Sequence, residues 1–188
     1  MHVAKRGLRA LGIAESYCGR TTSTLAGVVM RKDLRIDGFS SATVTVGGMD
    51  ATDCILRMVR ALDRNDLNCI LLSGCVIAWF NVIDIDFLAE STGRPVICVT
   101  YEESEGLLED IRHHFPGDAG RLEAYRKLKE RFPFRLRTGE TIYLRASGIP
   151  GPDAAQLCND FTYDGKIPEP LRVARLLARQ ILSDPSQS

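Results

Sequence analysis

The chain of 188 residues has no excess of charge of either sign, because Lys and Arg together number 24 and Asp and Glu together also number 24. A protein that attracts phosphate backbones through its overall field is strongly basic, so this balance leaves only a local patch for that role. The densest basic stretch comprises Arg121, Arg126, Lys127, Lys129, Arg131, Arg135 and Arg137. Glu123 and Glu130 interrupt it, which favours a solvated helix face over a phosphate-binding patch.

Long apolar runs are also missing. No window approaches the ~18 apolar residues that a membrane-spanning helix requires, and the first nine residues contain no signal-like apolar stretch. The six cysteines include no C-x-x-C pair, and Cys69, Cys75 and Cys98 lie inside apolar runs. We therefore expect buried free thiols and a cytoplasmic protein without a membrane partner.

Histidine and tryptophan are scarce. His113 and His114 are neighbours near a predicted helix end and point about 100° apart, so they do not form a chelating pair, and we expect them to interact with the helix dipole. The single tryptophan, Trp79, follows the Ser73-Gly74 turn in a predicted loop at the carboxyl end of a central strand, where open α/β sheets bind ligands. An exposed Trp79 would stack on a base, whereas a buried one would pack against the protein.

The hydrophobic period changes along the chain from 2 to 3.6. Three extended segments with short connections come first and predict an antiparallel meander, after which helical periods alternate with short apolar runs typical of strands buried on both faces. The expected strands are residues 8–13, 25–30, 42–46, 67–72, 95–99 and 141–145. The expected helices are residues 51–62, 82–90, 105–115, 119–132, 152–158 and 168–181.

This order of elements predicts one ribonuclease H-like α/β domain over residues 1–182. Its mixed central sheet would contain the three-strand antiparallel meander followed by parallel strands, with helices on its flanks. Residues 183–188 are polar and follow the last predicted helix, so we expect a disordered tail.

Six segments, in the right order and spread over nearly the whole chain, resemble an archaeal family of unknown function, the domain of unknown function 99 family, which is similar in fold to endonuclease V. The segments are Leu11-Gly12-Ile13, Asp33-Leu34-Arg35-Ile36-Asp37-Gly38, Gly48-Met49-Asp50-Ala51-Thr52, Phe80-Asn81-Val82-Ile83-Asp84, Thr92-Gly93-Arg94-Pro95-Val96, and Ile167-Pro168-Glu169-Pro170-Leu171-Arg172-Val173-Ala174. The resemblance implies the fold more strongly than it implies an activity.

Endonuclease V-like enzymes hold one or two divalent metal ions with carboxylates, because Mg²⁺ prefers hard oxygen ligands and a metal pair stabilises both the attacking and the leaving oxygen. The resemblance places the first acid of that site at Ala14 or Glu15, the second at Ser73, a lysine at Tyr101 and a histidine at Arg175. The expected group is missing at Ala14, Ser73, Tyr101 and Arg175. We therefore expect a degraded nuclease site and no cofactor.

Three hypotheses follow. The first is a non-catalytic endonuclease V-like protein that binds a nucleic acid, a nucleotide or a partner protein at the former cleft. Its cleft residues would be Ser73, Trp79, Asn81, Tyr101, Arg172 and Arg175. The second is an active Mg²⁺- or Mn²⁺-dependent endonuclease that uses Glu15 and Asp50, with Asp84 as a further metal ligand, although Asp50 also fits a helix N-cap. The third is a scaffold protein.

Overall fold

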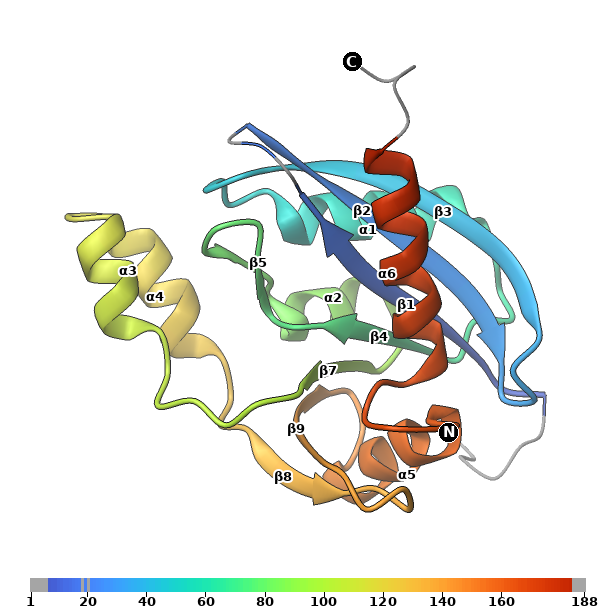
Figure 1. Ribbon diagram of the computed structural model, residues 1–188. Coiled ribbons are helices and arrows are strands. Elements are labelled where there is room, and N and C mark those ends of the chain that lie inside the picture. The colour runs from blue at the N-terminus through green and yellow to red at the C-terminus, as the bar shows by residue number, and fades with distance from the viewer. Residues whose placement is uncertain (1–6, 18, 20, 184–188) are drawn as a thin grey trace.

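A seven-stranded mixed sheet with strand order β3-β2-β1-β4-β7-β9-β8 runs through the protein (Figure 1). The computed structural model describes residues 7–17, 19 and 21–183. Strands β1 (Arg9–Ser16), β2 (Thr22–Arg31) and β3 (Ile36–Thr45) form the predicted antiparallel meander at one edge, and all three are longer than the sequence pattern indicates.

The parallel part of the sheet confirms the second half of the prediction. Strand β4 (Cys69–Ser73) pairs parallel to β1, and β7 (Val96–Thr100) pairs parallel to β4. Strand β9 (Thr141–Ser147) then pairs antiparallel to β7, and β8 (Phe132–Arg135) forms the far edge. The carboxyl ends of β4 and β7 therefore lie side by side.

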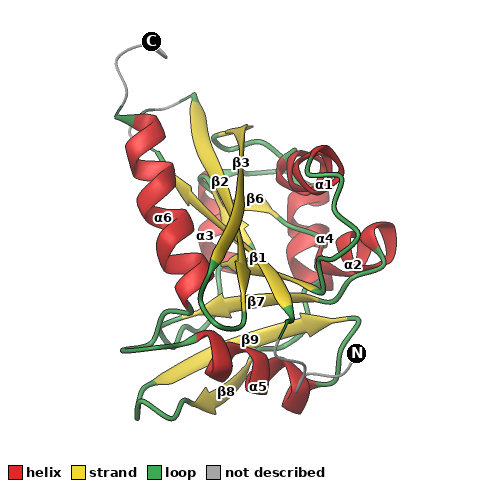
Figure 2. Ribbon diagram, turned by 90° about the vertical axis from the view of Figure 1, so that its right-hand side faces the viewer, coloured by secondary structure: helices red, strands yellow, loops and turns green. Residues whose placement is uncertain are grey.

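Helices cover both faces of this sheet. They are α1 (Ala51–Ala61), α2 (Ile85–Thr92), α3 (Leu108–His114), α4 (Ala119–Lys127), α5 (Gly151–Phe161) and α6 (Glu169–Leu182). Figure 2 shows α6 on one side of the sheet and α1 and α2 on the other. None of the helices in the described ranges is long and apolar enough to cross a membrane.

Side chains of β1 alternate between two apolar clusters, one on each face of the sheet. Leu11 and Ile13 pack in the cluster that contains α1, whereas Ala10 and Ala14 pack in the cluster that contains α5 and α6. This is the ordinary two-residue period of a strand. It follows that Ala14 and its neighbour Glu15 point to opposite faces.

Two predicted helices include residues that the structure places in strands. The helix expected over residues 119–132 ends at Lys127, and its last expected residue, Phe132, begins the edge strand β8, where Pro133 is tolerated because an edge strand has unpaired backbone groups. The helix expected from residue 82 begins at Ile85, because the residues before it form a hairpin of β5 (Val76–Ile77) and β6 (Asn81–Val82).

The cysteines only partly match the prediction of free buried thiols. Cys54, Cys69 and Cys158 are free and buried, but Cys75 and Cys98 form a disulfide with 6.0 Å between their Cα atoms. The prediction for this pair was wrong because sequence spacing does not reveal that the loop after β4 returns to β7. Cys18 and residues 184–188 of the predicted disordered tail lie outside the described residues. Ser183, the first residue of that predicted tail, is the C-cap of α6, and its amide donates a 3.0 Å hydrogen bond to the Arg179 carbonyl.

Gly12 allows α6 to pack directly on β1. A Cβ atom at Gly12 would lie 2.5 Å from the backbone carbonyl carbon and from the Cβ of Pro170, with backbone that has little freedom to move. We expect Gly12→Ala to lower the free energy of unfolding by about 1–3 kcal/mol, the usual cost of overpacking a core. Urea denaturation measures the change. As the matched control, Gly120→Ala in the exposed part of α4 should be neutral or stabilising by up to about 1 kcal/mol; equal effects of the two changes would refute the packing explanation.

Candidate functional site

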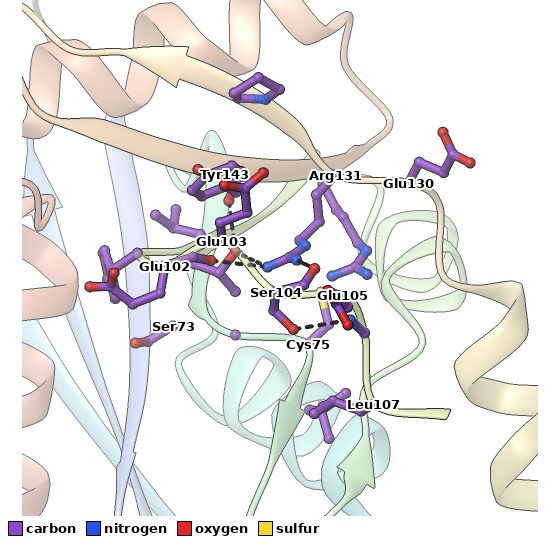
Figure 3. Close-up of a pocket in the computed structure, with 18 of the residues that line it drawn as sticks. Ser73, Cys75, Glu102, Glu103, Ser104, Glu105, Leu107, Glu130, Arg131 and Tyr143 are labelled. Carbon is purple, nitrogen blue, oxygen red and sulfur yellow. Dashed lines mark hydrogen bonds between the residues drawn. The ribbon is translucent and has the colours of Figure 1, made fainter. Parts of the chain in front are cut away.

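A cavity of about 740 Å³ opens at the carboxyl ends of β4 and β7 (Figure 3). Ser73 from β4, Tyr101 after β7, Arg145 from β9 and Arg175 from α6 all line it. Carboxyl ends of parallel strands are where open α/β sheets bind their ligands, because the connecting loops diverge there. The cavity is therefore the candidate ligand site of the chain.

The four positions that the resemblance assigned to metal-site groups lie on one face of the sheet. Ile13 is in register with Leu72, so Ala14 at the end of β1 lies next to Ser73 at the end of β4. Ala14 packs in the cluster under α6, and Tyr101 packs against the same cluster. Helix α6 brings Arg175 to the same place. The predicted proximity of these four residues is thus present in the structure.

Arg175 occupies the centre of this arrangement. Its Nη2 atom donates a 3.0 Å hydrogen bond to Ser73 Oγ, and its guanidinium carbon lies 5.5 Å from the centroid of the Tyr101 ring. Burial raises the pKa of Tyr101, and the nearby Ser73 and Arg175 offset only part of that rise. The Tyr101 hydroxyl is buried and makes no well-formed hydrogen bond within the described part of the chain. The phenol therefore stays neutral at physiological pH.

These residues do not fit a divalent metal ion. The groups at Ala14, Ser73, Tyr101 and Arg175 are a methyl group, a hydroxyl, a neutral phenol and a cation, whereas Mg²⁺ and Mn²⁺ take carboxylate and other hard oxygen ligands. The Arg175 charge also repels a second cation at this distance. Across residues 7–17, 19 and 21–183, no group of three or more His, Cys, Asp or Glu is placed to hold a metal ion.

Glu15 lies on the opposite face and is already engaged. Its carboxylate accepts hydrogen bonds from the Ala78 amide at 2.9 and 3.0 Å and from Ser23 Oγ at 2.7 Å. These contacts fix the hairpin of β5 and β6 to the end of β1. Glu15 shares a small pocket with Ser73, but it does not line the large cavity that contains Tyr101 and Arg175.

Asp50 and Asn81 form a separate hydrogen-bonded group at the start of α1. The Asp50 carboxylate accepts from Asn81 Nδ2 at 2.7 Å and from Thr45 Oγ1 at 2.8 Å, and its side chain makes no N-cap bond to α1. Asn81 is fully buried, and its Oδ1 accepts from the Ala51 amide at 3.1 Å. Neither residue lines the cavity, so Asn81 joins β3, α1 and β6 rather than facing a ligand.

The remaining predicted site residues also lie apart from the cavity. Asp84 caps α2 by accepting a 2.9 Å hydrogen bond from the Phe87 amide, and Arg172 pairs with Glu169 one turn earlier on the exposed side of α6. Trp79 is 46% exposed at the tip of the hairpin of β5 and β6. Sequence reasoning thus grouped residues that the fold distributes over the cavity, the hairpin of β5 and β6, the starts of α1 and α2, and the exposed side of α6.

Arg121 is a structural residue that the sequence analysis placed wrongly on a solvated face. It is 4% exposed, and its guanidinium donates to the carbonyls of Gly47 at 2.8 Å, Gly48 at 3.0 Å and Phe80. The sequence signal for this position is Asp118, three residues earlier, which caps α4 and pairs with Arg121. Arg121 therefore fixes the loop after β3 and the hairpin tip to α4.

Two further arginines line the cavity: Arg131, which sequence analysis assigned to a solvated helix face, and Arg145, to which it assigned no role. Arg131, drawn in Figure 3, donates to the backbone carbonyls of Glu102 at 3.3 Å and Ser104 at 2.6 Å, which shapes the loop after β7. Burial lowers the pKa of Arg145, an effect that Tyr125 partly offsets, but the group keeps its charge. Three arginines, Arg131, Arg145 and Arg175, therefore line the cavity together with four glutamates.

Asp50 should give the protein a measurable acid sensitivity. Partial burial raises its pKa, but the hydrogen bonds from Asn81 and Thr45 outweigh that effect, so the folded pKa lies below the usual 3.8. A depressed folded pKa stabilises the protein above the unfolded value, and this stabilisation is lost as pH falls through the folded one. We expect urea denaturation to show that Asp50→Asn has a lower free energy of unfolding than the wild type at pH 7. This difference in free energy should become smaller below pH 3.8. A difference in free energy of unfolding that does not change with pH would contradict the lowered pKa of Asp50.

Comparison with known proteins gives the same architecture. The family model described as endonuclease dU matches residues 6–182. A UPF0215 protein of Pyrobaculum calidifontis is 40% identical over 173 residues, which cover 89% of this chain and 93% of that protein. A protein of unknown function from Archaeoglobus fulgidus superposes with a TM-score of 0.81 at 27% identity, covering 94% of this chain and 99% of that chain.

The fold extends to a group of nucleases. Human endonuclease V superposes with a TM-score of 0.68 at 17% identity, covering 97% of this chain and 87% of that chain. At this identity the likeness concerns the fold alone, and it confirms the predicted ribonuclease H-like architecture. From the family match and the close relative, the chain belongs to the UPF0215 family, whose model is described as endonuclease dU.

Proposed function

We propose that the chain binds a nucleic-acid strand in the cavity at the ends of β4 and β7, with Arg175 as a phosphate contact and without a divalent metal ion. The observation that carries this proposal is the Arg175 guanidinium, held by Ser73 and lying beside the Tyr101 ring inside the cavity. A guanidinium matches the geometry of phosphate oxygens, and its charge in a partly enclosed site attracts an anion strongly.

The charges around the cavity suggest how a strand would lie. Arg131, Arg145 and Arg175 supply positive charge, whereas Glu102, Glu103, Glu105 and Glu130 also line the cavity. Carboxylates repel phosphates but accept hydrogen bonds from the N–H groups of bases. A strand with its phosphates at Arg175 and a base edge toward the carboxylates satisfies both kinds of group.

A second candidate function is cleavage of a strand that contains deoxyuridine, which the description of the family model favours. In its Mg²⁺- or Mn²⁺-dependent form this activity would use Glu15 and Asp50, with Asp84 as a further ligand. These carboxylates accept hydrogen bonds from the Ala78 amide, the Asn81 side chain and the Phe87 amide, respectively. The catalytic form requires these hydrogen bonds to break.

Arg175→Ala tests the binding proposal. We expect the variant to bind a labelled single strand containing deoxyuridine about tenfold more weakly, since a hydrogen bond to a charged group contributes about 1.5–3 kcal/mol. Fluorescence anisotropy in EDTA measures the affinity, which should fall as salt increases because counterions compete for the phosphates. Arg179→Ala is the matched control, because Arg179 is exposed one turn further along α6.

Three results would contradict the proposal. An equal loss of affinity for Arg175→Ala and Arg179→Ala would show that the positive charge of the surface, and not the cavity, binds the strand. Strand cleavage that requires Mg²⁺ or Mn²⁺ and disappears in Glu15→Gln or Asp50→Asn would establish the nuclease instead. Absence of binding to DNA and RNA at low salt would favour the third hypothesis, a scaffold protein.

A further inference from the structure

The turn that carries Trp79 has a strained backbone. Ala78, Trp79 and Phe80 have φ angles of 42°, 59° and 61°, so three consecutive residues other than glycine occupy the left-handed region. Each such residue is strained by its Cβ atom, and the conformation persists only where the surrounding structure imposes it. The turn therefore requires strong external support.

Three residues supply that support from different elements. Glu15 at the end of β1 accepts the Ala78 amide at 2.9 Å, and the Gly47 amide donates to the Ala78 carbonyl at 2.7 Å. The buried guanidinium of Arg121 donates to the Phe80 carbonyl. The backbone on both sides of Trp79 is thus fixed, while its indole remains 46% exposed.

The neighbouring rings cover only part of the indole. The His114 ring lies 4.8 Å from Trp79 at 59°, and the Phe80 ring lies 5.4 Å away in an edge-on geometry. His113 in turn contacts His114 at 4.9 Å. Two polar imidazole rings beside the indole suit a nucleobase better than the apolar side chains of a protein partner.

Trp79 is also close to the cavity along two chain segments. Cys75 and Val76 line the cavity and lead into the hairpin, and Leu107 lines it just before α3. The seven residues of α3 span about 10 Å and end at His114, against the indole. A strand that leaves the cavity along α3 therefore reaches Trp79.

From these contacts, and resting on the proposed function, we propose that Trp79 is a preformed stacking platform for an unpaired nucleobase of the strand that occupies the cavity. Glu15 is then a positioning residue that holds the platform through the Ala78 amide. Base stacking on an aromatic side chain does not depend on base identity, because every base has a π-face. The platform would therefore add affinity for the strand without selecting one base over another.

The intrinsic fluorescence of the full chain tests the proposal directly, because Trp79 is the single tryptophan. The probes are an oligothymidine of about ten nucleotides and a matched strand in which abasic sugars replace the bases. We expect the oligothymidine to quench the Trp79 emission and the abasic strand to leave it unchanged. Anisotropy of labelled oligothymidine should show about tenfold weaker binding for Trp79→Ala and near-normal binding for Trp79→Phe.

Three further variants separate stacking from other effects. Phe39→Ala is the matched control, because Phe39 is 55% exposed on the edge strand β3, and it should bind like the wild type. Glu15→Ala should weaken oligothymidine binding, whereas Glu15→Gln should restore it, since the amide oxygen still accepts the Ala78 N–H. A metal ligand would not be rescued by glutamine.

Two outcomes would overturn the platform. If the wild type binds oligothymidine and Arg175→Ala weakens that binding, but Trp79→Ala binds normally and the emission does not change, the platform is wrong while the proposed function stands. If the wild type binds neither strand, both proposals fail. Because the emission measurement uses the wild type, this test does not depend on the folding of any variant.

Discussion

Successive side chains of a strand point to opposite faces of a sheet, and at the end of β1 this alternation separates Ala14 from Glu15. Ala14 lies on the α6 face, next to Ser73, where a metal-binding carboxylate would have to be. Glu15, although adjacent in sequence, lies on the other face and anchors the hairpin. A change of one residue along a strand is therefore enough to convert a potential metal ligand into a structural one.

The α6 face is organised around a cation instead. Gly12 lets α6 lie against β1, and this close packing carries Arg175 to Ser73 at the mouth of β4. The buried phenol of Tyr101 stays neutral beside it, so this side chain does not neutralise the guanidinium. The same packing that stabilises the sheet thus produces a site suited to an anion.

The central fold was predictable because short apolar runs and helical periods are local signals. Strands β4 and β7 and their parallel pairing follow from two runs of buried aliphatic residues with a helix between them. Strand β8 and the hairpin of β5 and β6 were missed, since Phe132–Arg135 and Asn81–Val82 carry weak patterns and are fixed by pairing with other segments. The disulfide between Cys75 and Cys98 was missed for the same reason, because it joins residues from separate segments of the chain.

For the site, the resemblance pointed to four positions, and the structure brings three of them, Ser73, Tyr101 and Arg175, together. The roles of Glu15, Asn81 and Arg121 were not predictable, because each depends on partners more than 30 residues away or on the loops they join. Arg121 illustrates the difficulty: its sequence context is that of a solvated helix, yet the fold places carbonyl groups of Gly47 and Phe80 around it.

A crystal structure of the chain with a strand that contains deoxyuridine, grown with Mn²⁺ and measured at the manganese absorption edge, tests the central claim most directly. We expect a phosphate against the Arg175 guanidinium and no anomalous peak between the strand and the protein. A manganese ion coordinated by Glu15 or Asp50 and by the strand would contradict the proposal that the chain binds the strand without a divalent metal ion.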